Sequence, residues 1–187
     1  MRLIKRISGL LLLLLMAIVA YPFLVPPAPP SSGHSIVINK AMNRLYYYSN
    51  GKFERHYPVA TGREPDLTPE GDFRIIIKIA NDAGLGAESV FGTRWMGLEV
   101  PGDEDGTRYG IHGTNEPDSI GKHASAGCVR MSKADVEELY DRVPIKTRVH
   151  IVPGTVVQRS IIQLQPDRSG LSDEFYLFRE VPVRCGL

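Results

Sequence analysis

The dipeptide Asn50-Gly51 lies between two runs of β-forming residues and constrains the fold more than any other feature of the chain. Both residues accept the positive φ angles of a two-residue hairpin turn, so residues 44–49 and 52–60 are predicted to pair as antiparallel strands. Three consecutive tyrosines occupy positions 46–48 of the first run. We expect them to be strand residues divided between the two faces of a sheet.

Further strand patterns follow along the chain. Residues 36–38, 108–112 and 147–152 are predicted to be short strands, and residues 73–80 are rich in isoleucine, which is typical of a buried strand. The stretch 81–107 is rich in glycine and has little periodicity, so we expect a long loop of the kind that is often functional.

One helix is predicted, beginning after Ser132. This serine is suited to the N-cap position, because its hydroxyl can accept a backbone N–H of the first turn. The apolar residues that follow have helical spacing, and Pro144 ends the pattern. They are Val136, Leu139, Tyr140 and Val143.

The N-terminal residues 1–25 have the composition of a targeting segment. Basic residues at 2, 5 and 6 precede an apolar stretch, which is expected to be helical. Two alternatives stay open: a signal peptide cleaved near Ala17 or Ala20, or a membrane anchor over residues 7–25. Residues 26–33 are a proline-rich linker. Both alternatives place the following domain, residues 34–153, outside the cytoplasmic membrane, in the periplasm or cell wall. Residues 154–187 are a tail that we do not assign.

The composition excludes several function classes. The net charge is +1, with 22 basic and 21 acidic residues, so no basic field for nucleic acid is expected. The sequence has no Cys-x-x-Cys pair and no HExxH motif, so we expect neither a metal site nor a cofactor. The two cysteines are Cys128 and Cys185. A disulfide between them would block Cys128, so we expect Cys185 to be a free thiol near the C-terminus.

Residues 109–131 hold the residues best suited to chemistry. Cys128 is flanked by small residues that leave a thiol approachable, and His112 lies on a predicted strand upstream. A thiol becomes a good nucleophile when a base takes its proton, and imidazole does this near neutral pH. A cysteine and a histidine brought together by the fold are therefore predicted to form an acyl-transfer site. His123 is the rival base, and its loop position suggests exposure.

Three ordered motifs resemble the L,D-transpeptidase catalytic domain, the YkuD family. They are HGTN at 112–115 with SAGCVRM at 125–131, ATG at 60–62 with TPEGDFRI at 68–75, and FGTRWMGL at 91–98. The resemblance implies a mostly β, β-sandwich-like domain with one helix after the catalytic cysteine. It also implies Cys128 as nucleophile, His112 as base, the Gly113 carbonyl as the group that orients the base, and an oxyanion hole of amides from Gly127 and Cys128.

Five residues are predicted to bind substrate. Arg130 is suited to gripping a carboxylate, with a structural ion pair as the alternative. Trp95 either lines a peptide groove or fills the edge of the core. The other three are Ser125, Tyr109 and Asn115.

The resemblance implies a reaction in two halves. Cys128 attacks a peptidoglycan stem tetrapeptide and releases D-alanine, and an amine then takes the acyl group. The acceptor is a second stem peptide, giving a 3→3 cross-link, or a protein or D-amino acid. Two alternatives stay open: an L,D-carboxypeptidase or murein peptidase on the same site, and an inactive murein-binding module. If residues 1–25 stay uncleaved, the membrane is a further partner.

Overall fold

The computed structural model describes residues 16, 33–80 and 85–154 of the 187-residue chain. Apart from single residues, the described ranges leave out the N-terminal segment 1–25, the linker 26–33 and the tail 154–187, so the predictions for these segments lie outside them. In the described ranges, no helix has both the length and the apolar character needed to cross a membrane.

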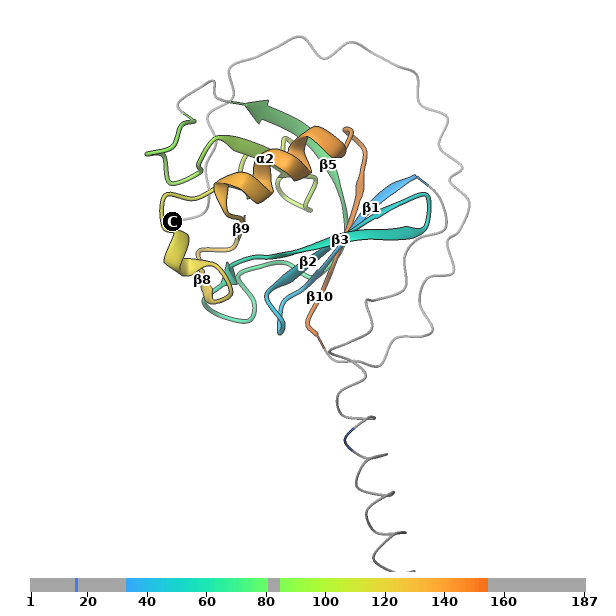
Figure 1. The fold of residues 1–187 in the computed structure, drawn as a ribbon, viewed down its shortest axis with the longest axis horizontal. Helices are drawn as coiled ribbons and strands as arrows, with labels where there is room; N and C mark the ends of the chain where they lie inside the picture. Colours follow the sequence, from blue (N-terminus) through green and yellow to red (C-terminus); the bar gives the residue numbers. More distant parts are fainter. Residues whose placement is uncertain (1–15, 17–32, 81–84, 155–187) are drawn as a thin grey trace, which may run out of the picture.

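The described chain is mostly β, as predicted, with a single α-helix (Figure 1). The elements in chain order are β1 (His34–Asn39), β2 (Arg44–Ser49), β3 (Lys52–Pro58), β4 (Thr61–Gly62), β5 (Gly71–Ala80), β6 (Arg94–Leu98), β7 (Gly110–His112), the 3₁₀ turn η1 (Pro117–Ser119), β8 (His123–Ser125), β9 (Val129–Arg130), α2 (Lys133–Arg142) and β10 (Arg148–Val152).

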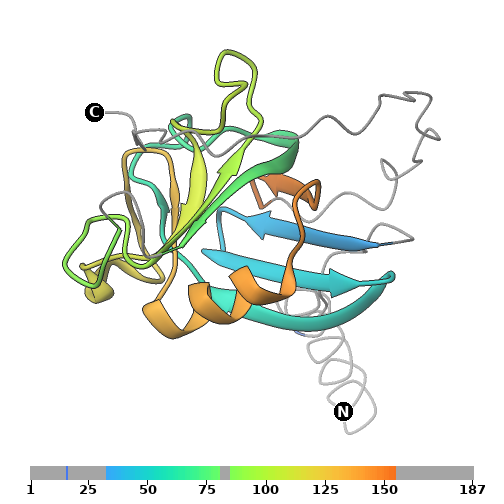
Figure 2. The same cartoon turned by 90° about the horizontal axis from the view of Figure 1, so that it is seen from above.

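Eight strands form one sheet in the order β3-β2-β1-β10-β5-β6-β7-β9, and β4 pairs with β8 in a second, small sheet. The pairs β1–β10 and β7–β9 are parallel, and the other neighbours in the large sheet are antiparallel. The large sheet curls, so β5 and β6 run at a steep angle to β1 and β2 (Figure 2). The main core is formed by buried side chains from strands across this sheet and from α2.

The predicted hairpin is confirmed. β2 pairs with β3 around Asn50 and Gly51, whose φ angles are 50° and 74°. The tyrosines divide between the faces as expected: Tyr47 belongs to the main core, whereas Tyr46 and Tyr48 pack in a second cluster.

The predicted helix is also confirmed. The Ser132 side chain caps α2 by accepting the Asp135 N–H at 3.2 Å. The apolar residues Val136 and Leu139 are buried in the main core together with Val143, the C-cap residue. This apolar face packs α2 onto the main core.

The prediction of an unbroken loop over residues 81–107 is wrong, because β6 lies within it. This strand is central, between β5 and β7, and four of its five residues are buried. A strand that is buried on both faces shows no polar–apolar alternation, so the period that marks a half-exposed strand is missing.

Candidate active site

The parallel pairing of β7 with β9 brings the predicted base next to the predicted nucleophile. His112 is opposite Arg130 in the register, and Cys128 immediately precedes β9. The backbone N–H of Met131 also donates to the carbonyl of His112 at 2.8 Å. Trp95 links the two residues, because its indole stacks on the imidazole and packs in one buried cluster with Cys128. Residues far apart in sequence thus share one side of the sheet.

His112 is buried, with 2% of its surface exposed. Its Nδ1 lies 2.5 Å from the carbonyl oxygen of Gly113. A carbonyl can only accept a hydrogen bond, so Nδ1 carries the proton and Nε2 keeps its lone pair. Nε2 is buried and has no hydrogen-bond partner in the described part of the chain. The ring is held by Trp95, stacked at 5.3 Å, and by Phe91, edge-on at 5.3 Å.

Burial lowers the pKa of His112 to about 4. The backbone of Gly113 and, more weakly, that of Phe91 act in the opposite direction, and the positive charge of Arg130 lowers the pKa further. The imidazole is therefore neutral at pH 7, which is the form that can accept a proton.

Cys128 is disulfide-bonded in this structure, contrary to the expectation of a free thiol. The only other cysteine in the sequence, Cys185, lies outside the described residues. The Cys128 sulfur is 3.4 Å from the carbonyl oxygen of Arg108, and a disulfide sulfur has no proton to donate there. Because the thiolate is the nucleophilic form of cysteine, acyl transfer at this position requires reduction first.

The turn that carries Cys128 is held by side-chain hydroxyls. Ser125 Oγ donates to the Cys128 carbonyl at 2.5 Å and accepts the Gly127 N–H at 3.1 Å. Gly127 has a φ of 137°, a conformation that side chains rarely adopt. One of the two predicted oxyanion donors, the Gly127 amide, is therefore already engaged inside the turn.

The structure separates the predicted substrate-binding residues into two groups. Trp95 and Ser125 are buried, and the indole N–H of Trp95 donates to the Gly106 carbonyl at 3.0 Å. These positions favour a packing role for Trp95 and a bracing role for Ser125.

The other three residues are more accessible. The Arg130 guanidinium pairs with the Glu116 carboxylate at 2.5 Å, and 18% of its side chain is exposed. The Tyr109 ring borders Gly127, and the Asn115 amide donates to the Glu88 carbonyl at 3.1 Å. Substrate binding by these residues stays a prediction, and the ion-pair alternative for Arg130 is present in the structure.

Sequence reasoning missed two residues that support the site. Thr68 lies in a recognised motif but had no role, and its hydroxyl donates to the Gly127 carbonyl at 2.9 Å. Asp103 is buried, and its carboxylate accepts the backbone N–H groups of Arg108 and Tyr109. An aspartate in a glycine-rich stretch favours such local backbone contacts, which is the one signal that could have identified it.

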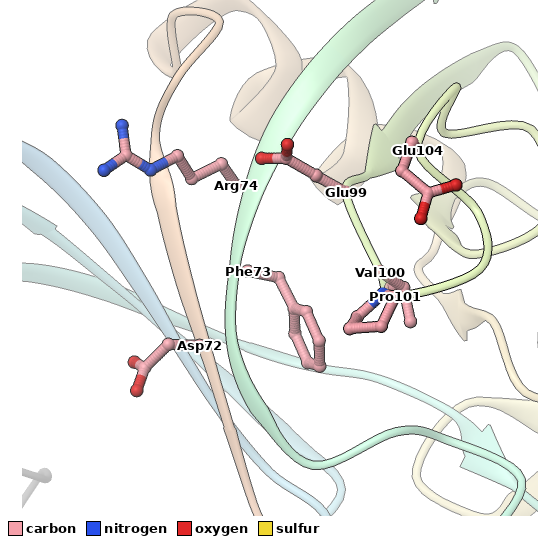
Figure 3. A pocket seen from close by; sticks show the side chains of 7 residues that line it. All are labelled: Asp72, Phe73, Arg74, Glu99, Val100, Pro101 and Glu104. Atoms are coloured by element: carbon pink, nitrogen blue, oxygen red, sulfur yellow. The ribbon is translucent and has the colours of Figure 1, made fainter. Parts of the chain in front are cut away.

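A pocket among the described residues lies away from the predicted site. An open pocket lies between β5 and the segment after β6, where the Phe73 ring faces Pro101 (Figure 3). It contains none of the predicted site residues. Within residues 33–80 and 85–154, no group of three or more His, Cys, Asp or Glu residues could hold a metal ion.

Comparisons with known proteins agree with the fold and the motifs. The sequence profile of the L,D-transpeptidase catalytic domain, YkuD, matches residues 33–151. The chain is 41% identical over 123 residues to the candidate L,D-transpeptidase YqjB of Bacillus subtilis, covering 62% of this chain and 69% of YqjB. It is 38% identical over 125 residues to the candidate L,D-transpeptidase YkuD of the same organism, and the match covers 67% of this chain and 70% of YkuD.

A solved L,D-transpeptidase from Xylanimonas cellulosilytica has a similar fold, with a TM-score of 0.54 and 26% identity over 73% of this chain and 69% of that one. The fold and the motifs are thus those of an L,D-transpeptidase catalytic domain. The chain belongs to the L,D-transpeptidase catalytic domain family.

Burial of neutral His112 predicts a pH-dependent stability. Its pKa is about 4 in the folded protein and about 6.5 when unfolded, so the unfolded chain binds the proton more tightly between these values. The contribution is complete above pH 6.5 and is lost as the pH falls towards 4, by at most about 1.4 kcal/mol per pH unit. Urea unfolding of the oxidised protein should show this slope, and the His112→Gln variant should show a smaller one. Equal slopes would contradict the assignment.

The oxidised state of Cys128 predicts a labelling experiment. Iodoacetamide should alkylate Cys128 in the native protein only after treatment with dithiothreitol, because a disulfide offers no thiolate. Peptide mass mapping of residues around 128 measures the product. Full labelling of the unreduced wild-type chain would show that the thiol is free in solution.

Proposed function

We propose that this chain is a cysteine L,D-transpeptidase that acts on peptidoglycan stem tetrapeptides outside the cytoplasmic membrane. The family and fold support peptidoglycan transpeptidase activity in general. The observation that carries the specific proposal is the contact between His112 Nδ1 and the Gly113 carbonyl. It leaves Nε2 as a proton acceptor on a neutral ring, and His112 lies on β7 next to β9, the strand that Cys128 immediately precedes.

The first half-reaction begins with reduced Cys128. His112 Nε2 takes the thiol proton, and the thiolate attacks the carbonyl of the third residue of the stem, an L-configured centre. The carbonyl oxygen gains negative charge, and the backbone N–H of Cys128 is the proposed donor to it. When the intermediate collapses, the proton on His112 moves to the nitrogen of D-alanine, which leaves. A thioester on Cys128 remains.

The second half-reaction reverses these roles. An amine acceptor gives up a proton to His112 and attacks the thioester, forming a new amide and regenerating the thiol. An acceptor stem peptide gives a 3→3 cross-link, and a protein or D-amino acid gives an attached product. Water as acceptor gives tripeptide, the product of a carboxypeptidase. Arg130, Tyr109 and Asn115 are the proposed contacts to the stem.

The base is predicted to be His112 and not His123. His123 is exposed, and its Nδ1 lies 3.0 Å from the Thr61 hydroxyl. His112→Gln should lower D-alanine release from a disaccharide-tetrapeptide by about 100- to 10,000-fold, the usual cost of losing a general base. His123→Gln is the matched control and should stay within a few-fold of wild type. Cys128→Ala should be folded, by circular dichroism, and inactive. The reverse order of the two histidine variants would place the base elsewhere.

Donor selectivity is the second prediction from the mechanism. The reduced full-length chain should form a Cys128 adduct with tetrapeptide stems and with carbapenems, whose strained lactam is an activated carbonyl. Pentapeptide stems ending in D-alanyl-D-alanine should not react, because their scissile carbonyl belongs to a D-centre. Intact-mass spectrometry detects each adduct, and a 3→3 dimer is the expected product.

The outcomes separate the alternatives. An adduct that resolves only to tripeptide would indicate a carboxypeptidase, whereas absence of any adduct on reduced Cys128 would indicate a binding module. Turnover of pentapeptide at an equal rate would reject the L,D assignment.

A further inference from the structure

Thr68 lies in the loop between β4 and β5 and contacts the turn that carries Cys128. Its side chain is buried, with 1% exposed. The hydroxyl donates to the Gly127 carbonyl at 2.9 Å and accepts the Gly62 N–H at 2.8 Å. The hydroxyl therefore accepts one hydrogen bond and donates its single proton to the Gly127 carbonyl.

This hydrogen bond fixes the direction of one peptide group. The Gly127–Cys128 bond is trans, as are all peptide bonds in the described chain. In a trans peptide, the carbonyl and the following N–H point in opposite directions. Holding the Gly127 carbonyl on the side of Thr68 therefore turns the Cys128 N–H towards the opposite side.

The loop that presents Thr68 is itself anchored. Lys40 is buried, and its ammonium group donates to the carbonyls of Pro65 and Thr68 and to the Glu70 carboxylate. All three ammonium protons are thus used on this loop. The loop also lies close to the turn that carries Cys128, because a Cβ on Gly127 would lie 2.8 Å from the Leu67 carbonyl oxygen. The hydrogen bond from Thr68 to the Gly127 carbonyl and the three Lys40 contacts thus hold the loop beside the turn.

We infer that Thr68 is a positioning residue that aims the Cys128 amide at the developing oxyanion, with Lys40 holding the loop that carries it. The inference rests on the proposed function in one respect, namely that reduced Cys128 attacks a carbonyl and so creates an oxyanion. The carbonyl can belong to any ester or amide that forms an acyl-enzyme with Cys128. Alignment of a donor matters in the transition state and not in thiolate formation, so two reactions of the same thiol should respond differently.

The test compares acylation with alkylation of Cys128 in the reduced full-length chain, and peptide mass mapping separates adducts on Cys128 from those on Cys185. p-Nitrophenyl acetate acylates Cys128 through a tetrahedral oxyanion, whereas iodoacetamide alkylates it by displacement without one. Thr68→Val should slow acylation by about 10- to 100-fold, which is a smaller effect than removing an oxyanion-hole donor outright. Alkylation should stay within about two- to three-fold of wild type, because it forms no oxyanion. Thr68→Ser, which keeps the hydroxyl, should restore most of the acylation rate. Thermal unfolding checks each variant, and Thr68→Ala replaces Thr68→Val if valine prevents folding.

Each outcome decides the inference. Acylation at the wild-type rate without the hydroxyl would overturn it, and so would an equal fall in both reactions, which indicates general loosening of the site. It is also overturned if wild-type Cys128 reacts with the ester no faster than in the urea-unfolded chain. If the ester series behaves as expected but stem peptides and carbapenems form no adduct, the proposed function fails and the role of Thr68 stands.

Discussion

The parallel pairing of β7 with β9 is the constraint on which the rest of the site depends. It is short, with Ile111 opposite Val129 and His112 opposite Arg130, yet it is the only direct strand pairing between the segment of His112 and the segment of Cys128 in the described chain. Close packing behind it leaves little room to adjust: a Cβ on Gly113 would lie 3.0 Å from the Cα of Gly92. The glycine after His112 thus serves two purposes, since its carbonyl orients the imidazole and its missing side chain lets the neighbouring loop approach.

The immediate contacts of the site are mostly neutral. A backbone carbonyl orients His112, and the hydroxyls of Ser125 and Thr68 hold the catalytic turn. A carboxylate in place of the Gly113 carbonyl would favour the protonated imidazole and raise its pKa. With a carbonyl, burial has the larger effect, and the ring stays neutral at pH 7. The charged residues lie one layer further out, where Arg130 pairs with Glu116 and Lys40 anchors its loop.

Local patterns were sufficient to predict much of the fold. The hairpin at Asn50-Gly51 and the cap of α2 at Ser132 depend on backbone conformations that few residue types favour, so sequence specifies them directly. Strand β6 was missed because burial on both faces removes alternation. In the site, motifs identified the residues to consider, but bracing by Ser125 and Thr68 depends on which carbonyl each hydroxyl meets after folding. For Thr68, the carbonyl that the hydroxyl meets is that of Gly127, more than fifty residues away in sequence, so packing between distant segments decides this contact.

The oxidised cysteine and the low pKa of His112 are connected. In the disulfide form the Cys128 sulfur carries no negative charge, and burial is the largest influence on the pKa of His112. Reduction allows a thiolate at position 128, and a negative charge in a buried site favours the protonated imidazole. The proton then belongs to the pair and not to either residue alone. A base with a low pKa in the oxidised form is therefore compatible with proton transfer from the thiol, because the thiolate that forms stabilises the imidazolium that accepts the proton.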